Sequence, residues 1–543
     1  MRKLGLALLV LTLAGGSTLG LAACGSSSNG KEGGTLTGSY ASFPEYLDPA
    51  LSYSTEGWTA IYDTYLPLLT YAHASGAAGS KVVPGLAKGL PKVTNGGKTY
   101  TLTLRKGLRY SDGTPVKASD FPASVERMLA LESGGSSFYT SIVGAEKFAE
   151  TKQGHVGGIK ADDRTGKIVI DLTAPRGTFT NELAMPFVAL LPKGTPVKNL
   201  TADPPPATGP YAIVKSQPGR GWSYARNPQW SKVNGKLMPE IPSGHVNKIE
   251  IKVVSNDSTQ VNEVERGKTD WMQTAPPADL YSKIKQKYEG TQFRVEPTVS
   301  TYYFWMNTTK PPFDDLKVRQ AVNYAVNSAA LERIYAGTLT GLHQILPPGM
   351  PGHKPFDLYP HDMAKAKKLI AEANPSDRDI TVWTDNESPN NEAGEYYQGV
   401  LEELGFNAKF KEINAESYAP LIGNVNTPDL DTGWFDWFED YPHPNDFFQL
   451  QLAGESIQPS SNYNLSRMDD PALNKKIAEL NEQPLGPQQE AGYAALDREY
   501  MEQAPWAPYG TLTTSTFVSS AIDLDKVIYN PTFGDDLTSF QLK

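Results

Sequence analysis

Residues 98–129 read KTYTLTLRKGLRYSDGTPVKASDFPASVERML, and this stretch decides the fold. Apolar and polar residues alternate along 99–105, which predicts a half-buried strand. Asn-Gly-Gly at 95–97 predicts a turn before that strand, and Asp-Gly-Thr-Pro at 112–115 predicts a turn that aims the following helix. The stretch therefore encodes a strand, a turn and a helix, in that order.

The rest of the first half continues the alternating pattern. Segments 167–172 and 248–254 each alternate apolar with polar residues and predict two further strands. Residues 163–166 predict a turn before the first of them. We therefore expect the first half to be rich in strands joined by short turns.

Helices dominate the predicted second half. Asp314 can cap a helix over 315–336, and Gly337 would end it. Further helices are predicted from Asp362 onward and over 392–404, 471–482 and 487–503. They alternate with short apolar strands such as 379–383, which indicates an α/β arrangement with a mostly parallel sheet.

Ordered motifs along the chain resemble those of one known family. Within the opening stretch these are Leu104 to Gly107, Asp112 to Pro115, Asp120, Glu126 and Arg127. Elsewhere they are 33–49, Thr208 to Tyr211, Arg226 to Pro228, Gly267 to Asp270, Pro312 to Asp315, Val318 to Ala321 and 362–369. Together they are similar to the family-5 bacterial solute-binding proteins, the dipeptide- and oligopeptide-binding components of ABC importers. The resemblance covers nearly all of residues 33–543.

This resemblance implies an α/β fold of two lobes hinged around a ligand cleft. It is the type II periplasmic-binding-protein-like clamshell, with an extra domain on the first lobe. The first lobe is expected to comprise 35–75, 205–298 and 510–543, with the extra domain at 76–204 and the second lobe at 299–509.

The first residues predict export and lipid attachment. Two positive residues at 2–3 precede an apolar run over 4–13, which is too short to span a bilayer and is typical of a signal peptide. Residues 21–24, Leu-Ala-Ala-Cys, resemble a bacterial lipobox, which implies removal of 1–23 and acylation of Cys24, the only cysteine. Residues 24–34 would then form a Gly/Ser-rich linker at the membrane. An ordinary secretory signal with an incidental Cys24 is the alternative.

Aromatic and acidic residues gather at 434–448, WFDWFEDYPHPNDFF. In peptide-binding members of the family this segment carries a tryptophan and, three residues later, an aspartate that pairs with the peptide α-ammonium. The matching residues are Trp437 and Asp440, and Trp434 lies in the same segment. Such a charge-assisted hydrogen bond contributes about 1.5–3 kcal/mol and fixes the direction of the peptide. The alternative is that Asp440 is an exposed loop acid and that the aromatic residues are core.

Two aromatic groups earlier in the chain could also line the cleft. One is Tyr40 with Phe43, after the first strand, and the other is Tyr302 to Trp305, which includes Tyr303, at the entry to the second lobe. Core packing is the alternative role for each of these residues. Because neighbours in a strand face opposite sides, at most half of each group can meet a ligand.

One departure from the family leaves the ligand open. Some oligopeptide-binding relatives carry a basic residue shortly before the aspartate, whereas residues 433–436 here are Gly-Trp-Phe-Asp. The way a ligand carboxylate would be held is therefore undetermined, and an oligosaccharide or another small solute is the alternative ligand.

Other classes of protein fit the sequence less well. Gly-x-Ser-x-Gly and His-Glu-x-x-His are absent, and Gly-Lys-Thr at 97–99 and 267–269 lacks the first glycine of a phosphate loop. The acids near Asp440 leave a secreted hydrolase as a remote alternative. None of the seven histidines is spaced as a metal pair, so no metal or cofactor is expected. A net charge of −10 argues against nucleic-acid binding.

The sequence thus predicts a non-enzymatic, monomeric binding protein outside the cytoplasm. It would be held at the cell membrane through Cys24, capture peptides between its lobes, and deliver them to the transmembrane subunits of an ABC permease.

Overall fold

The computed structural model of the protein describes residues 31–460, 462–483 and 485–543. The predicted signal peptide and Cys24 lie outside these residues. None of the helices in the described ranges combines the length and apolar character needed to cross a bilayer.

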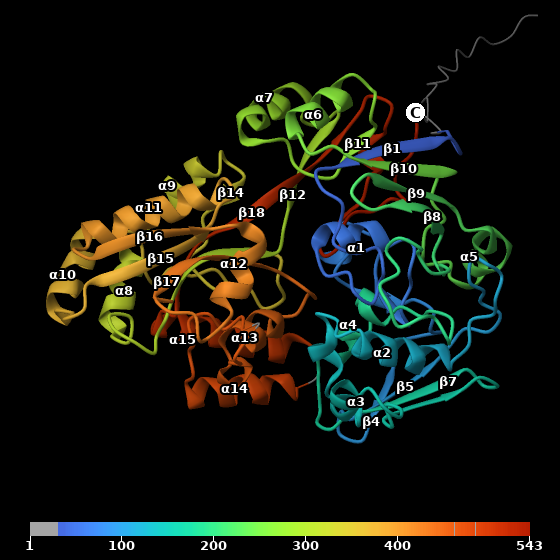
Figure 1. Cartoon of the computed structure of the whole chain (residues 1–543), viewed down its shortest axis with the longest axis horizontal. Coiled ribbons are helices and arrows are strands. Elements are labelled where there is room, and N and C mark those ends of the chain that lie inside the picture. Colours follow the sequence, from blue (N-terminus) through green and yellow to red (C-terminus); the bar gives the residue numbers. More distant parts are fainter. Residues whose placement is uncertain (1–30, 461, 484) are drawn as a thin grey trace, which may run out of the picture.

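Two large hydrophobic cores divide the chain (Figure 1). One takes its buried side chains from Leu36 to Trp271 and again from Val518 to Phe540, with Tyr441 added from elsewhere. The other lies between Val299 and Tyr509. The fold is therefore two-lobed, and we call these the first and second lobes. The exact residue boundaries of the domains stay a prediction.

One twelve-stranded sheet runs through both lobes. Its strands are β1 (Thr35–Tyr40), β8 (Tyr211–Gln217), β9 (Gly221–Arg226), β10 (Lys248–Val253), β11 (Trp271–Met272), β12 (Phe293–Pro297), β13 (Ser300–Met306), β14 (Leu339–Thr340), β15 (Asp379–Asp385), β16 (Asn407–Ile413), β17 (Thr432–Phe438) and β18 (Trp506–Val518). The strands predicted at 248–254 and 379–383 are confirmed as β10 and β15. The sheet is mixed, and the prediction of a mostly parallel sheet is wrong: β15 is parallel to both neighbours, whereas β13 and β18 are antiparallel to theirs.

The chain crosses between the lobes along β18 and along the link from β12 to β13 (Figure 1). The first part of β18 pairs with β13 in the second lobe, and its last part pairs with β11 and β12. Thr298, between β12 and β13, donates its hydroxyl hydrogen to the carbonyl oxygen of Leu512 over 2.7 Å. The two crossing segments are thus joined where they pass between the lobes.

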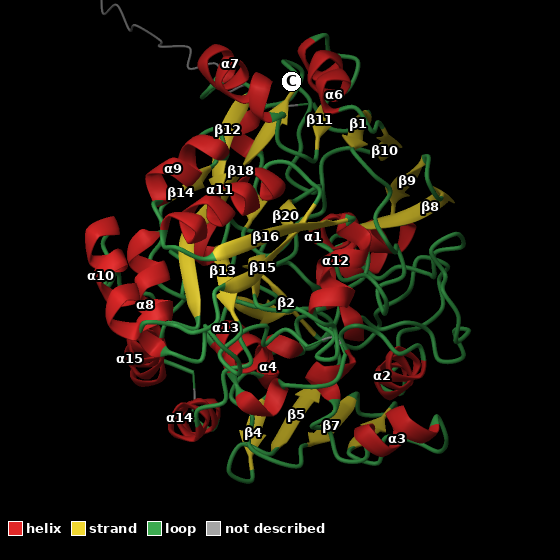
Figure 2. Ribbon diagram, turned by 60° about the vertical axis from the view of Figure 1, so that its left-hand side comes forward, coloured by secondary structure: helices red, strands yellow, loops and turns green. Residues whose placement is uncertain are grey.

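Helices flank the sheets on several sides (Figure 2). They are α1 (Thr55–Ile61), α2 (Asp120–Ala130), α3 (Ala145–Thr151), α4 (Phe179–Glu182), α5 (Gly235–Leu237), α6 (Asp257–Glu265), α7 (Ala278–Tyr288), α8 (Leu316–Ala325), α9 (Ser328–Ile334), α10 (Met363–Ala373), α11 (Asn390–Glu403), α12 (Ala415–Ile422), α13 (Asn445–Leu452), α14 (Pro471–Asn481) and α15 (Pro487–Gln503). Asp362 caps α10 through the amide of Lys365, as predicted.

The single helix predicted over 315–336 is wrong. Asp315, rather than Asp314, caps α8, which ends before Val326, whose backbone is extended. Asn327 then caps α9 by accepting the amide hydrogen of Ala329. The second cap interrupts an apolar periodicity that continues across both helices.

Residues 76–204 carry a separate four-stranded sheet in the order β4-β5-β7-β6. Its strands are β4 (Lys92–Thr94), β5 (Thr99–Thr103), β6 (Ile159–Asp162) and β7 (Lys167–Asp171). Two short two-stranded sheets pair β2 (Leu69–Tyr71) with β3 (Val82–Pro84), and β19 (Tyr529–Asn530) with β20 (Gly534–Asp535). Asp-Gly-Thr-Pro at 112–115 forms the predicted turn, in which Gly113 has a φ of +92° and Asp112 accepts the amide hydrogen of Thr114.

Two motif residues far apart in the sequence meet in the first lobe. Arg127, on α2, donates two hydrogen bonds to the carboxylate of Asp48, over 2.9 and 2.5 Å. Both side chains are buried. This bidentate ion pair fixes α2 and residues 76–204 to the start of the chain.

Candidate ligand cleft between the lobes

A cavity of about 610 Å³ lies where the lobes meet. The first lobe lines it with α1 and β11 and with residues near β19 and β20, and the second lobe with β13, α9 and the end of β17. Both crossing segments also line it, through Thr298–Val299 and 512–515. A ligand in this cavity would touch both lobes and the hinge at once, which is the geometry that couples binding to closure.

Carboxylates dominate the charged groups of the cavity wall. Glu56, Asp257, Glu439 and Asp535 line it, whereas the wall includes no lysine, arginine or histidine from the described residues. Burial raises the pKa of Glu439 to about 8 and that of Asp535 to about 7. Burial also raises the pKa of Glu56 and of Asp257. The cavity is thus an environment that favours cations or neutral acids.

Three consecutive residues after β17 reach from the second lobe to the first. Glu439 accepts the hydroxyl hydrogen of Thr532 over 3.0 Å, and Asp440 accepts that of Tyr53 over 2.8 Å. The Tyr441 ring joins the core of the first lobe and meets Phe138 edge-on, with ring centroids 6.0 Å apart. We call residues 439–441 the clasp.

Asp446, at the start of α13, holds the clasp in shape. Its Oδ2 accepts the amide hydrogen of Asp440 over 2.9 Å and the indole hydrogen of Trp437 over 3.2 Å. This shared acceptor ties the Trp437 side chain and the backbone of Asp440 to one carboxylate.

The acids in the clasp and Asp446 beside it have no cationic partner among the described residues. Among the ion pairs of the described residues, none involves Glu439, Asp440 or Asp446. Burial raises the pKa of Asp440 to about 7, while the hydrogen bond from Tyr53 lowers it. Burial and the nearby Asp440 also raise the pKa of Asp446. A ligand ammonium would compensate these carboxylates.

The other residues expected to meet a ligand pack inside the lobes. Trp434 donates its indole hydrogen to the Tyr509 hydroxyl over 2.7 Å in the second core. Tyr303 stacks on Trp506, with ring centroids 3.8 Å apart. Tyr40 packs edge-on against two tryptophans of the first core. None of these three residues lines the cavity described above, and neither do Trp437 and Asp440, which lie beside it in the clasp region.

Some residues of the cleft are predicted only as members of a group, and others carry no signal in the sequence. Of the aromatic group at 302–305, Tyr302 lines the cavity and Tyr303 does not, although both are buried in the second core. Glu56, Asp257 and Asp535 come from segments about 200 residues or more apart and meet only in the fold. Glu439 could have been found, since it adjoins Asp440 within the acidic and aromatic segment.

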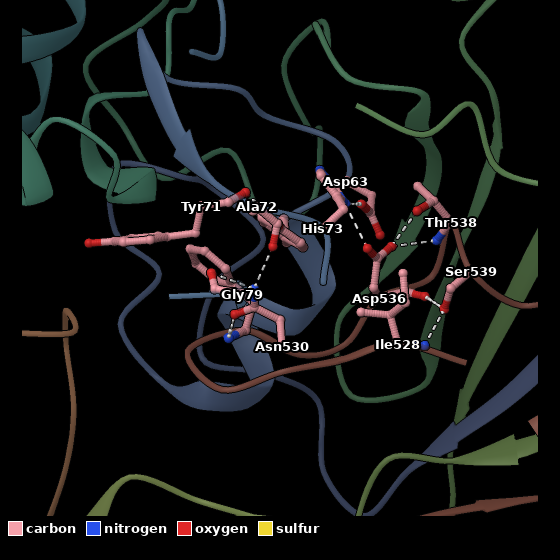
Figure 3. A network of polar contacts seen from close by, with 12 residues as sticks. Asp63, Tyr71, Ala72, His73, Gly79, Ile528, Asn530, Asp536, Thr538 and Ser539 are labelled. Atoms are coloured by element: carbon pink, nitrogen blue, oxygen red, sulfur yellow. Dashed lines mark hydrogen bonds and ion pairs between the residues drawn. The ribbon is translucent and has the colours of Figure 1, made fainter. Parts of the chain in front are cut away.

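One cluster of described residues has the composition of a metal site (Figure 3). His73 Nδ1 lies 2.6 Å from Asp536 Oδ2 and 3.7 Å from Asp63 Oδ1, and all three side chains are buried. Asp536 also accepts the amide hydrogen of Thr538 over 2.8 Å. The contact between His73 and Asp536 has the length of a charge-assisted hydrogen bond, so a buried hydrogen bond or ion pair explains the closeness of these two residues. It lies outside the cavity wall.

Comparison with known proteins shows which family has this architecture. Residues 81–458 match the profile of the bacterial extracellular solute-binding proteins, family 5 middle region. The chain is 28% identical over 495 residues to the dipeptide-binding protein of Escherichia coli (strain K12), covering 85% of this chain and 84% of that protein. It is 27% identical over 460 residues to the probable di/tripeptide-binding protein 5 of Pseudomonas aeruginosa (strain UCBPP-PA14), covering 79% and 81%.

Solved structures share the fold. The clavulanic acid biosynthesis oligopeptide binding protein 2 superposes with a TM-score of 0.85 at 24% identity, covering 94% of this chain and 96% of that one. The periplasmic binding protein DppA from Helicobacter pylori, in complex with the peptide STSA, superposes with a TM-score of 0.75 at 20% identity, covering 94% and 98%. Since the profile match takes in parts of both hydrophobic cores, the chain belongs to family 5 of the bacterial extracellular solute-binding proteins.

Proposed function

We propose that this protein captures short peptides in the cleft between its lobes and delivers them to an ABC permease. The observation that carries the proposal is the clasp: Asp440 is a buried carboxylate without a cationic partner among the described residues, at the boundary of the two lobes. A peptide α-ammonium fits that position, because it supplies the positive charge and the hydrogen-bond donors that the carboxylate needs. Asp446 and Trp437 position the clasp.

The size of the cavity supports a small ligand. Its volume of about 610 Å³ falls within the range of about 300–1,000 Å³ of small-molecule sites. Two curated relatives are named for dipeptides or tripeptides. An extended peptide could add its backbone to the neighbouring strands, while water fills space around its side chains.

Location and partners follow from the same proposal. Cys24 would anchor the protein outside the cytoplasmic membrane as a monomer, with residues 24–34 as the linker. A ligand that binds the closed arrangement of the lobes more tightly than the open one would shift the protein toward closure, by an amount set by the difference between the two affinities. The closed protein would then dock on the transmembrane subunits of the permease.

The test is the melting temperature of the full-length chain in a mild detergent, with and without a pool of di- and tripeptides. A ligand at one hundred times its Kd adds about 2.7 kcal/mol of stability. We expect a clear rise that Asp440→Asn abolishes and that Glu395→Gln, an exposed acid on α11, retains. No rise with peptides but a rise with an oligosaccharide pool would overturn the peptide assignment.

A further inference from the structure

We propose that the cleft selects peptides with a positively charged side chain, which binds in the cavity beside Glu439. The inference rests on the proposed function, because it concerns a second group of the same ligand. It narrows the proposed ligands from peptides in general to peptides with a cationic side chain.

The first observation is an unpartnered carboxylate oxygen in the cavity wall. Glu439 is 7% exposed, and one of its oxygens accepts from Thr532. The other, Oε2, is buried and has no hydrogen-bond partner among the described residues. Leaving a buried acceptor unsatisfied is costly, so this oxygen favours a ligand that donates. The backbone of Glu439 is held in place because its amide donates to Val299, on a crossing segment, over 3.0 Å.

The second observation is the charge of the surrounding wall. Glu56, Asp257 and Asp535 face the same cavity, and no basic side chain of the described residues does. A carboxylate side chain on the ligand would meet like charges in a partly desolvated site, and an apolar side chain would leave Glu439 Oε2 unpaired. A neutral donor such as citrulline would pair with this oxygen but would not balance the negative charge of the wall. A cation relieves both costs.

The third observation is the aromatic content of the wall. Rings from both lobes line it, namely those of Trp271, Tyr302, Tyr335, Phe438 and Tyr529. The faces of such rings attract cations, and a guanidinium group also stacks on them. Glu439 and Asp440 are neighbours in sequence, but only Glu439 lines this cavity, so the two carboxylates can serve different groups of one ligand.

The experiment compares tripeptides by calorimetric titration of the full-length chain in a mild detergent. Arginine is placed in turn at each position of an alanine tripeptide, and each peptide is paired with its citrulline counterpart, which keeps the shape and removes the charge. We expect at least one arginine peptide to bind about tenfold tighter than its citrulline counterpart. A difference of this size corresponds to the lower end of the free energy that a hydrogen bond to a charged group contributes. A glutamate peptide should bind weakest.

Two variants assign the preference to the cavity. Glu439→Gln should reduce the arginine-to-citrulline ratio several-fold, and the exposed control Glu395→Gln should keep it. The comparison of peptides on the unaltered protein needs no variant to fold. Equal binding of arginine, citrulline and alanine peptides would overturn this inference and leave the peptide function standing. Binding of no peptide at all would overturn the function itself.

Discussion

The hydroxyl of Tyr53 donates a hydrogen bond to the carboxylate of Asp440 over 2.8 Å, and the two residues belong to opposite lobes. Glu439 and Tyr441 beside Asp440 also contact the first lobe. The clasp therefore contributes to closure and, in our proposal, to ligand binding. A residue with both roles links the population of the closed state to the occupancy of the cleft.

Tyr53→Phe tests the contribution of this hydrogen bond to closure. A hydrogen bond to a charged group contributes about 1.5–3 kcal/mol, so its loss should shift unliganded protein toward an open arrangement. Small-angle X-ray scattering should show a larger radius of gyration for the variant. Saturating peptide should restore the radius of the unaltered protein. An identical radius in both unliganded proteins would contradict a role of Tyr53 in closure.

The pH dependence of stability tests the buried acids of the cleft. The pKa values of Glu439, Asp440 and Asp535 are raised by burial to about 8, 7 and 7. A raised pKa means that the folded protein binds more protons than the unfolded chain, so stability falls as pH rises from about 4 to about 8. The melting temperature without ligand should thus be higher at about pH 6 than at about pH 8.

Glu439→Gln supplies the matched comparison for that pH profile. A glutamine cannot ionise, so the variant should show a shallower fall of melting temperature over the same range. Glu395→Gln removes an exposed acid and should leave the slope unchanged. A steeper fall in Glu439→Gln would contradict the assignment.

Proton release on binding tests the same acids in the presence of a ligand. A bound cation stabilises the charged form of a carboxylate and so lowers its pKa. Binding of an arginine tripeptide near neutral pH should therefore release protons, seen as a dependence of calorimetric enthalpy on the ionisation enthalpy of the buffer. Glu439→Gln, which keeps Asp440 for the peptide ammonium, should release fewer protons. A buffer-independent enthalpy would mean that neither Glu439 nor Asp440 changes its protonation.

The sequence predicts the elements of this protein better than its site, for physical reasons. The strand over 99–105 and the cap at Asp362 depend on neighbours in the chain, and both are confirmed. The helix predicted over 315–336 is wrong because Asn327 forms an internal cap within a continuous apolar periodicity. Local sequence rules cannot decide between one long helix and two shorter helices when the apolar pattern is compatible with both.

The cleft depends on contacts between distant segments, which local patterns do not contain. Alternation in β13 implies that Tyr302 and Tyr303 face opposite sides, but both sides are buried in the second core, so the pattern does not tell which side adjoins the cavity. Asp535 reaches the cavity wall from β20, near the C-terminus, and meets Glu56 of α1 there only in the fold. The resemblance to a known family identified Asp440 as a candidate ligand residue, whereas Glu439 and Tyr53 became candidates only through their contacts in the fold.

The ion pair of Asp48 with Arg127 should matter for stability and not for ligand choice. Removing one partner of a buried pair leaves an uncompensated charge and costs about 3–5 kcal/mol. Arg127→Met should lower the denaturation midpoint accordingly, whereas the double variant with Asp48→Asn should recover part of the loss. The preference among peptides should persist wherever the variant is folded. An unchanged midpoint in Arg127→Met would contradict this role.

His73 separates the two interpretations of the cluster with Asp63 and Asp536. Burial alone would raise the pKa of Asp536, but His73 and the hydrogen bonds from Thr538 bring it below its ordinary value, as expected for an ion-paired carboxylate. Burial and the charge of Asp536 raise the pKa of Asp63. His73→Gln removes the partner of the buried Asp536 carboxylate and should cost about 1–3 kcal/mol by chemical denaturation. The control is His155→Gln, because the exposed ring of His155 contacts Glu126 and its loss should change stability by less than about 1 kcal/mol.

A chelator distinguishes an ion pair from a metal site at this cluster. If the cluster is an ion pair, a chelator leaves the melting temperature of the unaltered protein unchanged. If it holds a metal, the chelator lowers that temperature, and His73→Gln abolishes the effect.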